Sequence, residues 1–349
     1  MDTRVYKIED IHEDYKIIKR AASLIKEGQV VAFPTETVYG LGANALDGQA
    51  VERIFKAKGR PGDNPLIVHI ANRRDVEPLV LGISPKIHKL MEVFWPGPLT
   101  IILKKNHKVP SQTTAGLDTV ALRMPGHPIA LALIQEAGVP IAAPSANRSG
   151  KPSPTRAQHV VDDLCGRIPM ILDGGEAQVG LESTVLDMSG SIPTILRPGG
   201  VTLEMLRVVI DDVIVDSGVL KPMGNGQSPK SPGMKYTHYA PRALVTIVKG
   251  SIDYIVESIN KMANKAVNTG QKVGVMATDE TCREYEKGFI ISLGSRKHPS
   301  IIGANLFSTL RQFDEAGVDI ILAEWIDEEQ EGLAIMDRMI RAAGFRVIN

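Results

Sequence analysis

The chain has 349 residues, more than one ordinary domain holds, so we expect two domains with substantial cores. Its 40 lysines and arginines balance its 40 aspartates and glutamates, which argues against a global electrostatic attraction to nucleic acid or to an anionic membrane. The two cysteines lie far apart, and no apolar run approaches the ~20 residues of a membrane helix. We therefore predict a soluble, cytoplasmic protein without disulfides, zinc knuckle or membrane partner.

Helix and strand patterns alternate along the first 216 residues. Apolar spacing predicts helices over residues 13 to 27, 48 to 57, 84 to 93, 128 to 138 and 156 to 164. Short apolar runs predict strands over 29 to 33, 66 to 70, 101 to 103, 119 to 124, 139 to 143 and 170 to 173, with two more near 185 and 195. Residues 34 to 42 have the composition of a turn. This alternation favours an α/β domain whose loops carry the site.

A change of composition marks a second region. Residues 217 to 241 are rich in Gly, Pro, Ser, Lys and Asn, which is typical of a linker, and they close with KYTHYAP at 235 to 241. Beyond it the pattern reads β, α, β, β, α, β, α over 245 to 248, 252 to 266, 272 to 276, 289 to 293, 302 to 316, 319 to 324 and 333 to 343. That order predicts a separate, smaller Rossmann-like three-layer domain.

Cationic side chains stand just before the strand predicted at residues 66 to 70. Lys58 and Arg60 are two residues apart, and Pro61 and Pro65 restrict the backbone after them. A movable point charge beside a planar guanidinium suits a polyphosphate or a carboxylate. For an isolated KxR sequence, a solvated basic turn is the alternative.

Similar polar clusters end other predicted strands of the first 200 residues. Besides Lys58 and Arg60 they contain Thr35, Arg123, Ser145, Asn147, Ser183, Thr184 and Arg197. Four cations and several hydroxyls with few acids describe a pocket for a ligand with several negative charges. The common nucleotide motifs GxxxxGK[ST] and GxGxxG are absent, as are HExxH and GxSxG, so a bound nucleotide needs a site of another design.

Six short phrases resemble the YrdC-like threonylcarbamoyl-AMP synthases. They are PTETVYGL at 34 to 41, KGRP with NPL at 58 to 66, WPGPLT at 95 to 100, RMP at 123 to 125, PSAN at 144 to 147 and LRPG at 196 to 199. The tail resembles the extra domain of the family's long form, with Asp337 where an asparagine is expected. The resemblance implies a twisted α/β domain with a concave basic cleft (1 to 216), a linker that acts as a lid (217 to 241) and a Rossmann-like α/β/α domain (242 to 349).

The resemblance also implies an activity and its residues. L-threonine, bicarbonate or CO2, and ATP give threonylcarbamoyl-AMP and pyrophosphate, with Lys58 and Arg60 as catalytic cations and Arg60 near the bicarbonate. The residues implied for ATP are Lys58, Arg60, Asn64, Thr119, Ser145, Asn147, Ser153, Arg197 and Tyr236. Those implied for threonine are Thr35, His69, Arg123, Ala143 and Ser183. Mg²⁺ is expected with ATP, held by phosphates and water rather than by a dedicated protein site.

Partners and alternatives follow from the same reasoning. The product is expected to feed a tRNA threonylcarbamoyl-transferase complex, and the chain to be a monomer with weak or no direct tRNA binding. His69 can also be read as a satisfied histidine at a strand end, and Tyr236 as a residue packed on the linker. The rival function is an RNA-binding module that acts on tRNA or double-stranded RNA without adenylate synthesis. Zero net charge and the lack of a basic, aromatic-interleaved run count against it.

Overall fold

The structure, a computed structural model, describes residues 1–221 and 239–349. These residues form two compact units. Unit 1 comprises 1–149 and 153–219, and unit 2 comprises 150–152, 220–221 and 239–349. No helix in the described ranges combines the length and the apolar character required to cross a membrane.

Unit 1 is built on a large mixed sheet. Its strands are β1 (Arg4–Lys7), β2 (Val31–Phe33), β3 (Gly40–Asn44), β4 (Ile67–His69), β5 (Leu99–Lys104), β6 (Thr119–Arg123), β7 (Ile141–Ala142), β8 (Met170–Asp173), β9 (Thr184–Asp187), β10 (Thr194–Arg197) and β11 (Ile214–Val215). Its helices are α1 (Tyr15–Lys26), α2 (Gly48–Lys58), α3 (Pro85–Phe94), α4 (Ser111–Thr114), α5 (Pro128–Ala137), α6 (Ala157–Leu164) and α7 (Leu203–Val209), with a 3-10 helix η1 (Arg73–Leu79).

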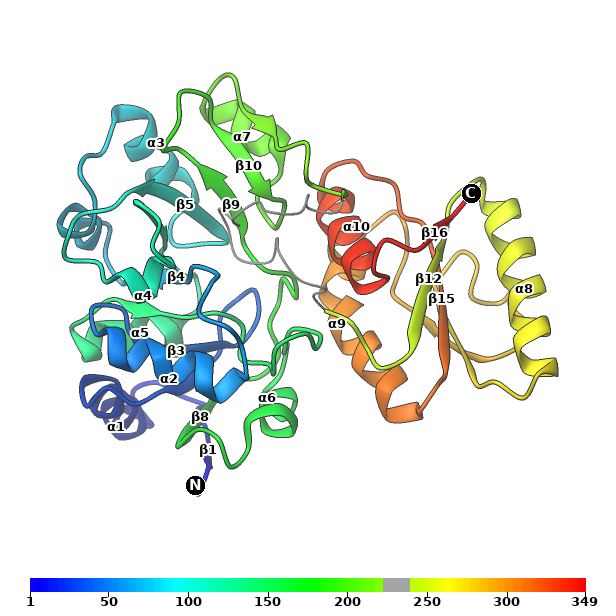
Figure 1. Cartoon of the computed structure of the whole chain (residues 1–349), viewed down its shortest axis with the longest axis horizontal. Coiled ribbons are helices and arrows are strands. Elements are labelled where there is room, and N and C mark those ends of the chain that lie inside the picture. The colour runs from blue at the N-terminus through cyan, green and yellow to red at the C-terminus, as the bar shows by residue number, and fades with distance from the viewer. Residues whose placement is uncertain (222–238) are drawn as a thin grey trace. The chain divides into compact units, whose positions relative to one another are not determined.

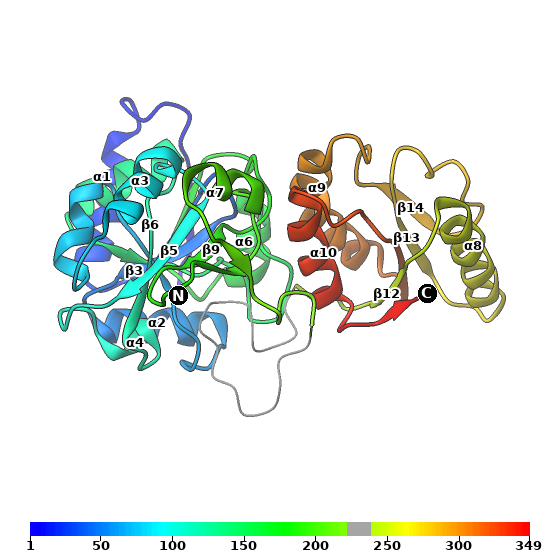
Figure 2. The same cartoon turned by 90° about the horizontal axis from the view of Figure 1, so that it is seen from above.

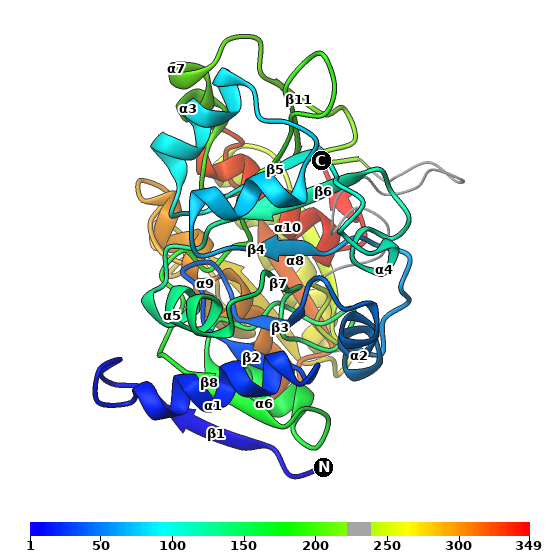
Figure 3. The same ribbon diagram turned by 90° about the vertical axis from the view of Figure 1, so that its left-hand side faces the viewer.

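The strands of unit 1 are not paired in chain order. The order across the sheet is β1-β8-β2-β3-β7-β4-β6-β5-β9-β10-β11. Figure 3 shows the strands from β5 through β6, β4, β7, β3 and β2 to β8 and β1 in this sequence. Parallel and antiparallel pairs alternate irregularly along it; β4 and β6, for example, are parallel, whereas β7 is antiparallel to both β3 and β4. Loops from distant parts of the chain therefore meet at the strand ends.

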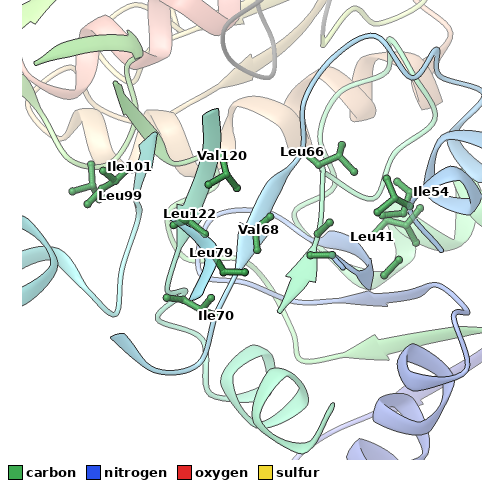
Figure 4. Packing of buried hydrophobic residues seen from close by; sticks show 14 of the residues in the cluster. Leu41, Ile54, Leu66, Val68, Ile70, Leu79, Leu99, Ile101, Val120 and Leu122 are labelled. Atoms are coloured by element: carbon green, nitrogen blue, oxygen red, sulfur yellow. The ribbon is translucent and has the colours of Figure 1, made fainter. Parts of the chain in front are cut away.

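Both faces of this sheet are covered by apolar side chains. In β2, Val31 and Phe33 pack with helices α1 and α5, whereas Ala32 between them belongs to the cluster on the other face. That second cluster contains Leu41, Val68 and Leu122 from the strands; Figure 4 shows Val68 close to Leu122, and Leu41 close to Ile54 of α2. Such burial on two sides favours continuous apolar strands, which is the pattern that made them recognisable in the sequence.

Helix α2 delivers Lys58 to a fixed place. Asp47 caps its start, since the Asp47 carboxylate accepts from the backbone N–H groups of Gln49 and Ala50. At its end Gly59 has φ 63°, in the left-handed region that glycine adopts without strain. Lys58 is therefore the last residue of the helix, and the chain turns directly into the loop of Arg60.

Unit 2 is a three-layer domain with a parallel sheet. Its strands are β12 (Leu244–Val248), β13 (Val273–Ala277), β14 (Phe289–Ser292), β15 (Ile320–Glu324) and β16 (Val347–Ile348), in the order β14-β13-β15-β12-β16. Its helices are α8 (Ile252–Asn268), α9 (Pro299–Ala316) and α10 (Glu331–Ala342). Figures 1 and 2 show α8 on one face of the sheet and α9 with α10 on the other.

Two buried charge clusters stabilise unit 2 from within. Asp337 on α10, 2% exposed, lies 2.9 Å from Arg338 Nη1 and 2.8 Å from Arg341 Nε. The carboxylate at the position where an asparagine was expected thus has two guanidinium partners. At the end of β15, the buried Glu324 accepts from the hydroxyls of Thr278 and Tyr285 at 2.9 and 2.7 Å.

The elements predicted from the sequence are present in the structure, which adds β1, β11, α4, α7 and η1 to those expected in unit 1. The predicted alternation of strands and helices after residue 244 is confirmed, with β16 in addition. In unit 1, the reading of residues 34 to 42 as a turn was wrong in part, because Gly40–Asn44 forms strand β3. An added Cβ at Gly42 would lie 2.6 Å from Ile141 Cγ2, so this strand is glycine-rich because a neighbouring side chain approaches its backbone closely.

Candidate active site

Arg123 is a buried cation at the end of β6, beside His69 at the end of β4. Its Nε donates to the Gly97 carbonyl at 3.2 Å, and its Nη1 donates to Thr37 Oγ1 at 2.9 Å. Its Nη2 lies 2.8 Å from Glu36 Oε1. One N–H on each terminal nitrogen is not used by these contacts, which suits two-point binding of a carboxylate.

Two threonines hold this loop in place. The Thr35 hydroxyl donates to the Val38 carbonyl at 2.6 Å. In the 2.8 Å bond between Thr35 and Thr37 the donor is therefore the Thr37 hydroxyl. Thr37 Oγ1 is left to accept from Arg123, so the hydroxyl pair fixes both the loop and the guanidinium.

The charges around Arg123 are set by burial. Burial raises the pKa of the Glu36 carboxyl, but the Arg123 guanidinium and hydrogen bonding outweigh it and hold that pKa below its usual value. Burial, together with the Arg123 charge, lowers the pKa of His69 to about 3. His69 is therefore neutral at physiological pH. Its Nδ1 lies 3.2 Å from the Ile67 carbonyl, which can only accept, so we assign the ring proton to Nδ1 and the lone pair to Nε2.

Lys58 forms a second buried cationic centre. Its ammonium donates to the carbonyl of Ser145, to the carbonyl of Asn147 at 2.7 Å and to Asn147 Oδ1 at 3.3 Å. Ser145 Oγ also donates to Asn147 Oδ1. The three hydrogens of the Lys58 ammonium are all donated to protein acceptors. Lys58 must therefore give up at least one of these hydrogen bonds to bind a phosphate.

Charges near Lys58 link it to the next group of side chains. Burial and the Arg60 charge lower the pKa of Lys58 well below its usual value, while Asp163 and Glu182 act in the opposite direction. Glu182 Oε1 in turn accepts from the buried Ser153 hydroxyl. Glu182 therefore connects Ser153 with the surroundings of Lys58.

Arg197 and Ser183 meet where β10 ends and β9 begins. Arg197 Nη2 donates to the Ser183 carbonyl at 2.9 Å and to Ser183 Oγ at 3.2 Å. The Ser183 hydroxyl lies 2.7 Å from Thr100 Oγ1 on β5. Gly199 makes this packing possible, because an added Cβ there would lie 2.3 Å from the Thr184 backbone nitrogen.

Comparison with known proteins gives matches along the whole chain. A family model described as "Telomere recombination" matches residues 23–199, and one described as "Threonylcarbamoyl-AMP synthase, C-terminal domain" matches residues 201–344. The threonylcarbamoyl-AMP synthase of Bacillus subtilis is 51% identical over 95% of this chain and 94% of its own length. The chain belongs to the threonylcarbamoyl-AMP synthase family. The family resemblance predicted from the six phrases is confirmed.

Solved structures of this synthase family include a close match. Sua5 of Pyrococcus abyssi, solved in complex with L-threonine, is 48% identical, with a TM-score of 0.92 over 100% of this chain and 99% of that chain. The threonylcarbamoyl-AMP synthase of Schizosaccharomyces pombe is 40% identical over 95% of this chain and 89% of its own length. The predicted two-domain α/β fold is confirmed.

The structure links most of the predicted site residues of this synthase into three groups. Arg123, Thr35 and His69 form one, Lys58, Ser145 and Asn147 the second, and Ser183 with Arg197 the third. An isolated bridge between Gly40 and Ser145 ties the strand after the Thr35 loop to the Lys58 group. Ser153 joins through Glu182, as described above. The ligand roles of these residues, and the concave shape of the cleft, stay predictions.

Other predicted residues lie farther from these links. Thr119 begins β6 and Arg123 ends it, which separates them by about 13 Å along the strand. Ala143 is buried, and its N–H donates to the Ile67 carbonyl at 2.9 Å. Arg60 is half-buried and close enough to Lys58 to influence its pKa. Tyr236 and most of the proposed lid, residues 222–238, lie outside the described residues, whereas Tyr239 at its end is buried and packs against Phe307.

Asn64 differs from the other predicted residues. It is fully buried, yet neither its amide nitrogen nor its amide oxygen has a hydrogen-bond partner in the described part of the chain. An unmet buried amide costs about 1–3 kcal/mol, so such a group in a native protein requires an explanation. A ligand atom that pairs with the amide would supply one.

Sequence reasoning missed three polar residues that the structure places in these groups. Glu36 and Thr37 contact Arg123 directly, and Glu182 accepts from Ser153. Glu36 and Thr37 lie in the phrase PTETVYGL, whose mixture of hydroxyls and a carboxylate was the available signal. Glu182 precedes Ser183 and had no such signal.

The described residues hold no group of three or more His, Cys, Asp or Glu side chains suited to a metal ion. Glu36 is paired with Arg123, and Glu182 with Ser153. The carboxylates of the described residues therefore do not form a protein cage for Mg²⁺.

Proposed function

We propose that this chain synthesises threonylcarbamoyl-AMP and pyrophosphate from L-threonine, bicarbonate or CO2, and ATP. The observation that carries the proposal is full-length similarity to proteins with this name, 51% and 48% identical, one of which was solved with L-threonine. The buried cations Arg123 and Lys58 support it, since one has N–H groups suited to a carboxylate and the other stands beside Arg60.

The reaction has two bond-forming steps. The threonine ammonium loses a proton, its nitrogen forms a C–N bond with CO2 as one C=O π bond opens, and a second proton leaves the nitrogen to water to give a carbamate. A carbamate oxygen then attacks the α-phosphorus of ATP, an O–P bond forms, and the bond from that phosphorus to the bridging oxygen breaks as pyrophosphate leaves. Negative charge gathers on the phosphoryl oxygens, so fixed cations are the main aid that the protein can give.

The residues of this chain divide between the two substrates. Arg123 would bind the threonine carboxylate, and the neutral His69 would offer Nε2 as an acceptor to the amino acid. Lys58, Arg60 and Arg197 would neutralise the triphosphate, and the Asn64 amide would pair with a ligand oxygen or N–H. Ser145, Ser153, Asn147 and Thr119 complete the proposed ATP set, while Thr35, Ala143 and Ser183 complete the proposed threonine set.

The remaining assignments are part of the same proposal. Mg²⁺ would arrive with the triphosphate and offset its charge. The product is an activated acyl adenylate, so a tRNA threonylcarbamoyl-transferase complex is the proposed consumer, with the cytoplasm as the place of reaction. A monomer with weak or no tRNA binding stays the expectation.

A substrate-omission assay tests the proposal. Pyrophosphate release from ATP is expected to require both L-threonine and bicarbonate, and to fall in Lys58→Ala and Arg60→Ala. Release without threonine would contradict it. A salt-dependent gel shift with tRNA, in a protein that consumes no ATP under these conditions, would favour the RNA-binding alternative.

A further inference from the structure

We propose that Glu36 is a positioning residue of the amino-acid site, which orients Arg123 for the substrate carboxylate. The inference rests on the proposed function, because it assigns a role to Glu36 only where Arg123 binds an amino acid. The threonine set assembled above contains Arg123 but not Glu36.

Glu36 contacts Arg123 directly. Glu36 Oε1 lies 2.8 Å from Arg123 Nη2, with the two side chains 13% and 4% exposed. Two hydrogen bonds also hold the guanidinium: Nε donates to the Gly97 carbonyl, and Nη1 donates to Thr37 Oγ1. Among the described residues that hold Arg123, Glu36 supplies the carboxylate, and its removal would leave that cation held by the neutral Gly97 carbonyl and Thr37 hydroxyl.

The hydrogen bonding of this pair is incomplete. Arg123 and the Gly126 backbone both favour the charged Glu36 carboxylate, yet the contacts of Arg123 Nη2 and of both carboxylate oxygens fall short of well-aligned hydrogen bonds in the described chain. Burying two charges costs more than their attraction returns unless the remaining hydrogen bonds are met. A pair retained for stability alone would be expected to satisfy them, as Asp337 and its two arginines do.

The groups around Glu36 and Arg123 add no further charge to the pair at pH 7. The titratable groups that act on Glu36, or on which it acts, are Arg123, His69 and His127. Both histidines are kept neutral at pH 7 by burial, which lowers their pKa values. Glu36 and Arg123 therefore form a neutral pair, and a carboxylate ligand on Arg123 meets a guanidinium whose orientation is already fixed.

The main test is a double-mutant cycle on the full chain. Glu36→Gln removes the charge at nearly constant shape. We expect the KM for L-threonine to rise about tenfold, with kcat changed less than threefold and the Kd for ATP alone unchanged. Arg123→Lys is expected to raise the threonine KM as well. Adding Glu36→Gln to it should cause no further rise, because Glu36 acts through Arg123.

Glu176→Gln is the matched control. Its partner Arg156 lies 2.9 Å away in an exposed pair, so the same chemical change is expected to leave all three constants unaltered. If Glu36→Gln does not fold, Glu36→Asp keeps the charge but withdraws it by one methylene, and a raised threonine KM is again expected.

The outcomes separate the two proposals. A wild-type threonine KM in the Glu36 variants, or equal losses for ATP and threonine, would overturn the role of Glu36 while leaving the proposed function intact. Independent, additive effects of Glu36→Gln and Arg123→Lys would also overturn it. Wild-type protein without threonine-dependent pyrophosphate release would instead overturn the proposed function.

Discussion

The buried carboxylates Glu324 and Asp337 of unit 2 are satisfied by protein partners, whereas Asn64 and Glu36 of unit 1 lack well-aligned partners among the described residues. Glu324 accepts from Thr278, Thr281 and Tyr285, and it pairs with Arg296 at 2.5 Å. Asn64 in unit 1 is equally buried, and neither end of its amide is met in the described chain. Burial of polar groups alone therefore does not indicate a ligand site; burial without partners does.

The surroundings of Lys58 in unit 1 differ in a similar way from those of the paired arginines in unit 2. Asp337 neutralises part of the charge of Arg338 and Arg341 on one helix of unit 2. Lys58 in unit 1 is held mainly by carbonyl and amide oxygens, with Arg60 nearby. A cation held by neutral groups keeps its field for an anion that arrives later, which is the arrangement that phosphoryl transfer uses.

The largest expected effect is on stability and falls in unit 2. Glu324→Ala leaves the partly buried Arg296 without its carboxylate and the buried hydroxyls of Thr278 and Tyr285 without their acceptor, so we expect the free energy of unfolding of this unit to fall by about 3–5 kcal/mol. The control is Glu328→Ala, whose exposed pair with Lys249 at 3.5 Å is worth less than about 1 kcal/mol. Urea unfolding followed by circular dichroism measures both. Equal losses in the two variants would break the comparison.

The next effect is on activity and falls in unit 1. Lys58→Ala removes a fixed cation, and we expect kcat for pyrophosphate release to fall about 100- to 1,000-fold. Lys56→Ala changes an exposed lysine two residues earlier on the same helix, and its kcat should match that of the wild type. Similar losses in both would show that general basicity, and not the placement of Lys58, matters.

A third effect is a pH dependence of stability. Folded His69 has a pKa of about 3, whereas an unfolded histidine has one of about 6.5. Between these values the unfolded chain binds more protons, so the free energy of unfolding falls as the pH falls, by about 2 kcal/mol from pH 7 to pH 5. His127, whose pKa burial also lowers, acts in the same direction. Between pH 7 and pH 5, the free energy of unfolding of His69→Asn should fall by about 2 kcal/mol less than that of the wild type, as measured by urea titrations. Parallel curves for the two proteins would refute the assignment.

The smallest effect sharpens the comparison within unit 1. Asn64→Leu replaces an unmet amide by an apolar group of similar shape, so the free energy of unfolding of the ligand-free protein should not fall. The Kd for ATP should rise about tenfold, as expected for the loss of one hydrogen bond to a charged ligand. Asn72→Leu is the contrast, because Asn72 caps η1 by accepting from the Arg74 N–H, and its loss should cost about 1 kcal/mol. Calorimetry gives the affinities and thermal unfolding the stabilities.

Sequence patterns could predict the elements but not how they are paired. Strands buried on both faces, such as Leu99–Lys104, are apolar runs and were recognised. Arg4–Lys7 was missed because it is a mostly exposed edge strand without an apolar face, and Gly40–Asn44 because glycines replace the usual β-branched residues. The strand order places β7 between β3 and β4 by antiparallel pairing, and this depends on long-range contacts that local sequence does not encode.

The candidate site shows the same limit. The short motifs KGRP, RMP and LRPG located the loops of Lys58, Arg123 and Arg197, because charged residues beside Pro and Gly are a signal that local sequence carries. They could not show that Asn147 Oδ1 accepts from Lys58 or that Glu36 pairs with Arg123, because both contacts join loops far apart in the chain. Asn147 thus holds Lys58 in this structure, in addition to any contact with ATP.

A crystal structure of the full chain with L-threonine and a non-hydrolysable ATP analogue would test the central claim most directly. We predict the threonine carboxylate within hydrogen-bond distance of Arg123, and an atom of the nucleotide paired with the Asn64 amide. Both ligands bound elsewhere, with Asn64 and Arg123 still in the surroundings described above, would contradict the account.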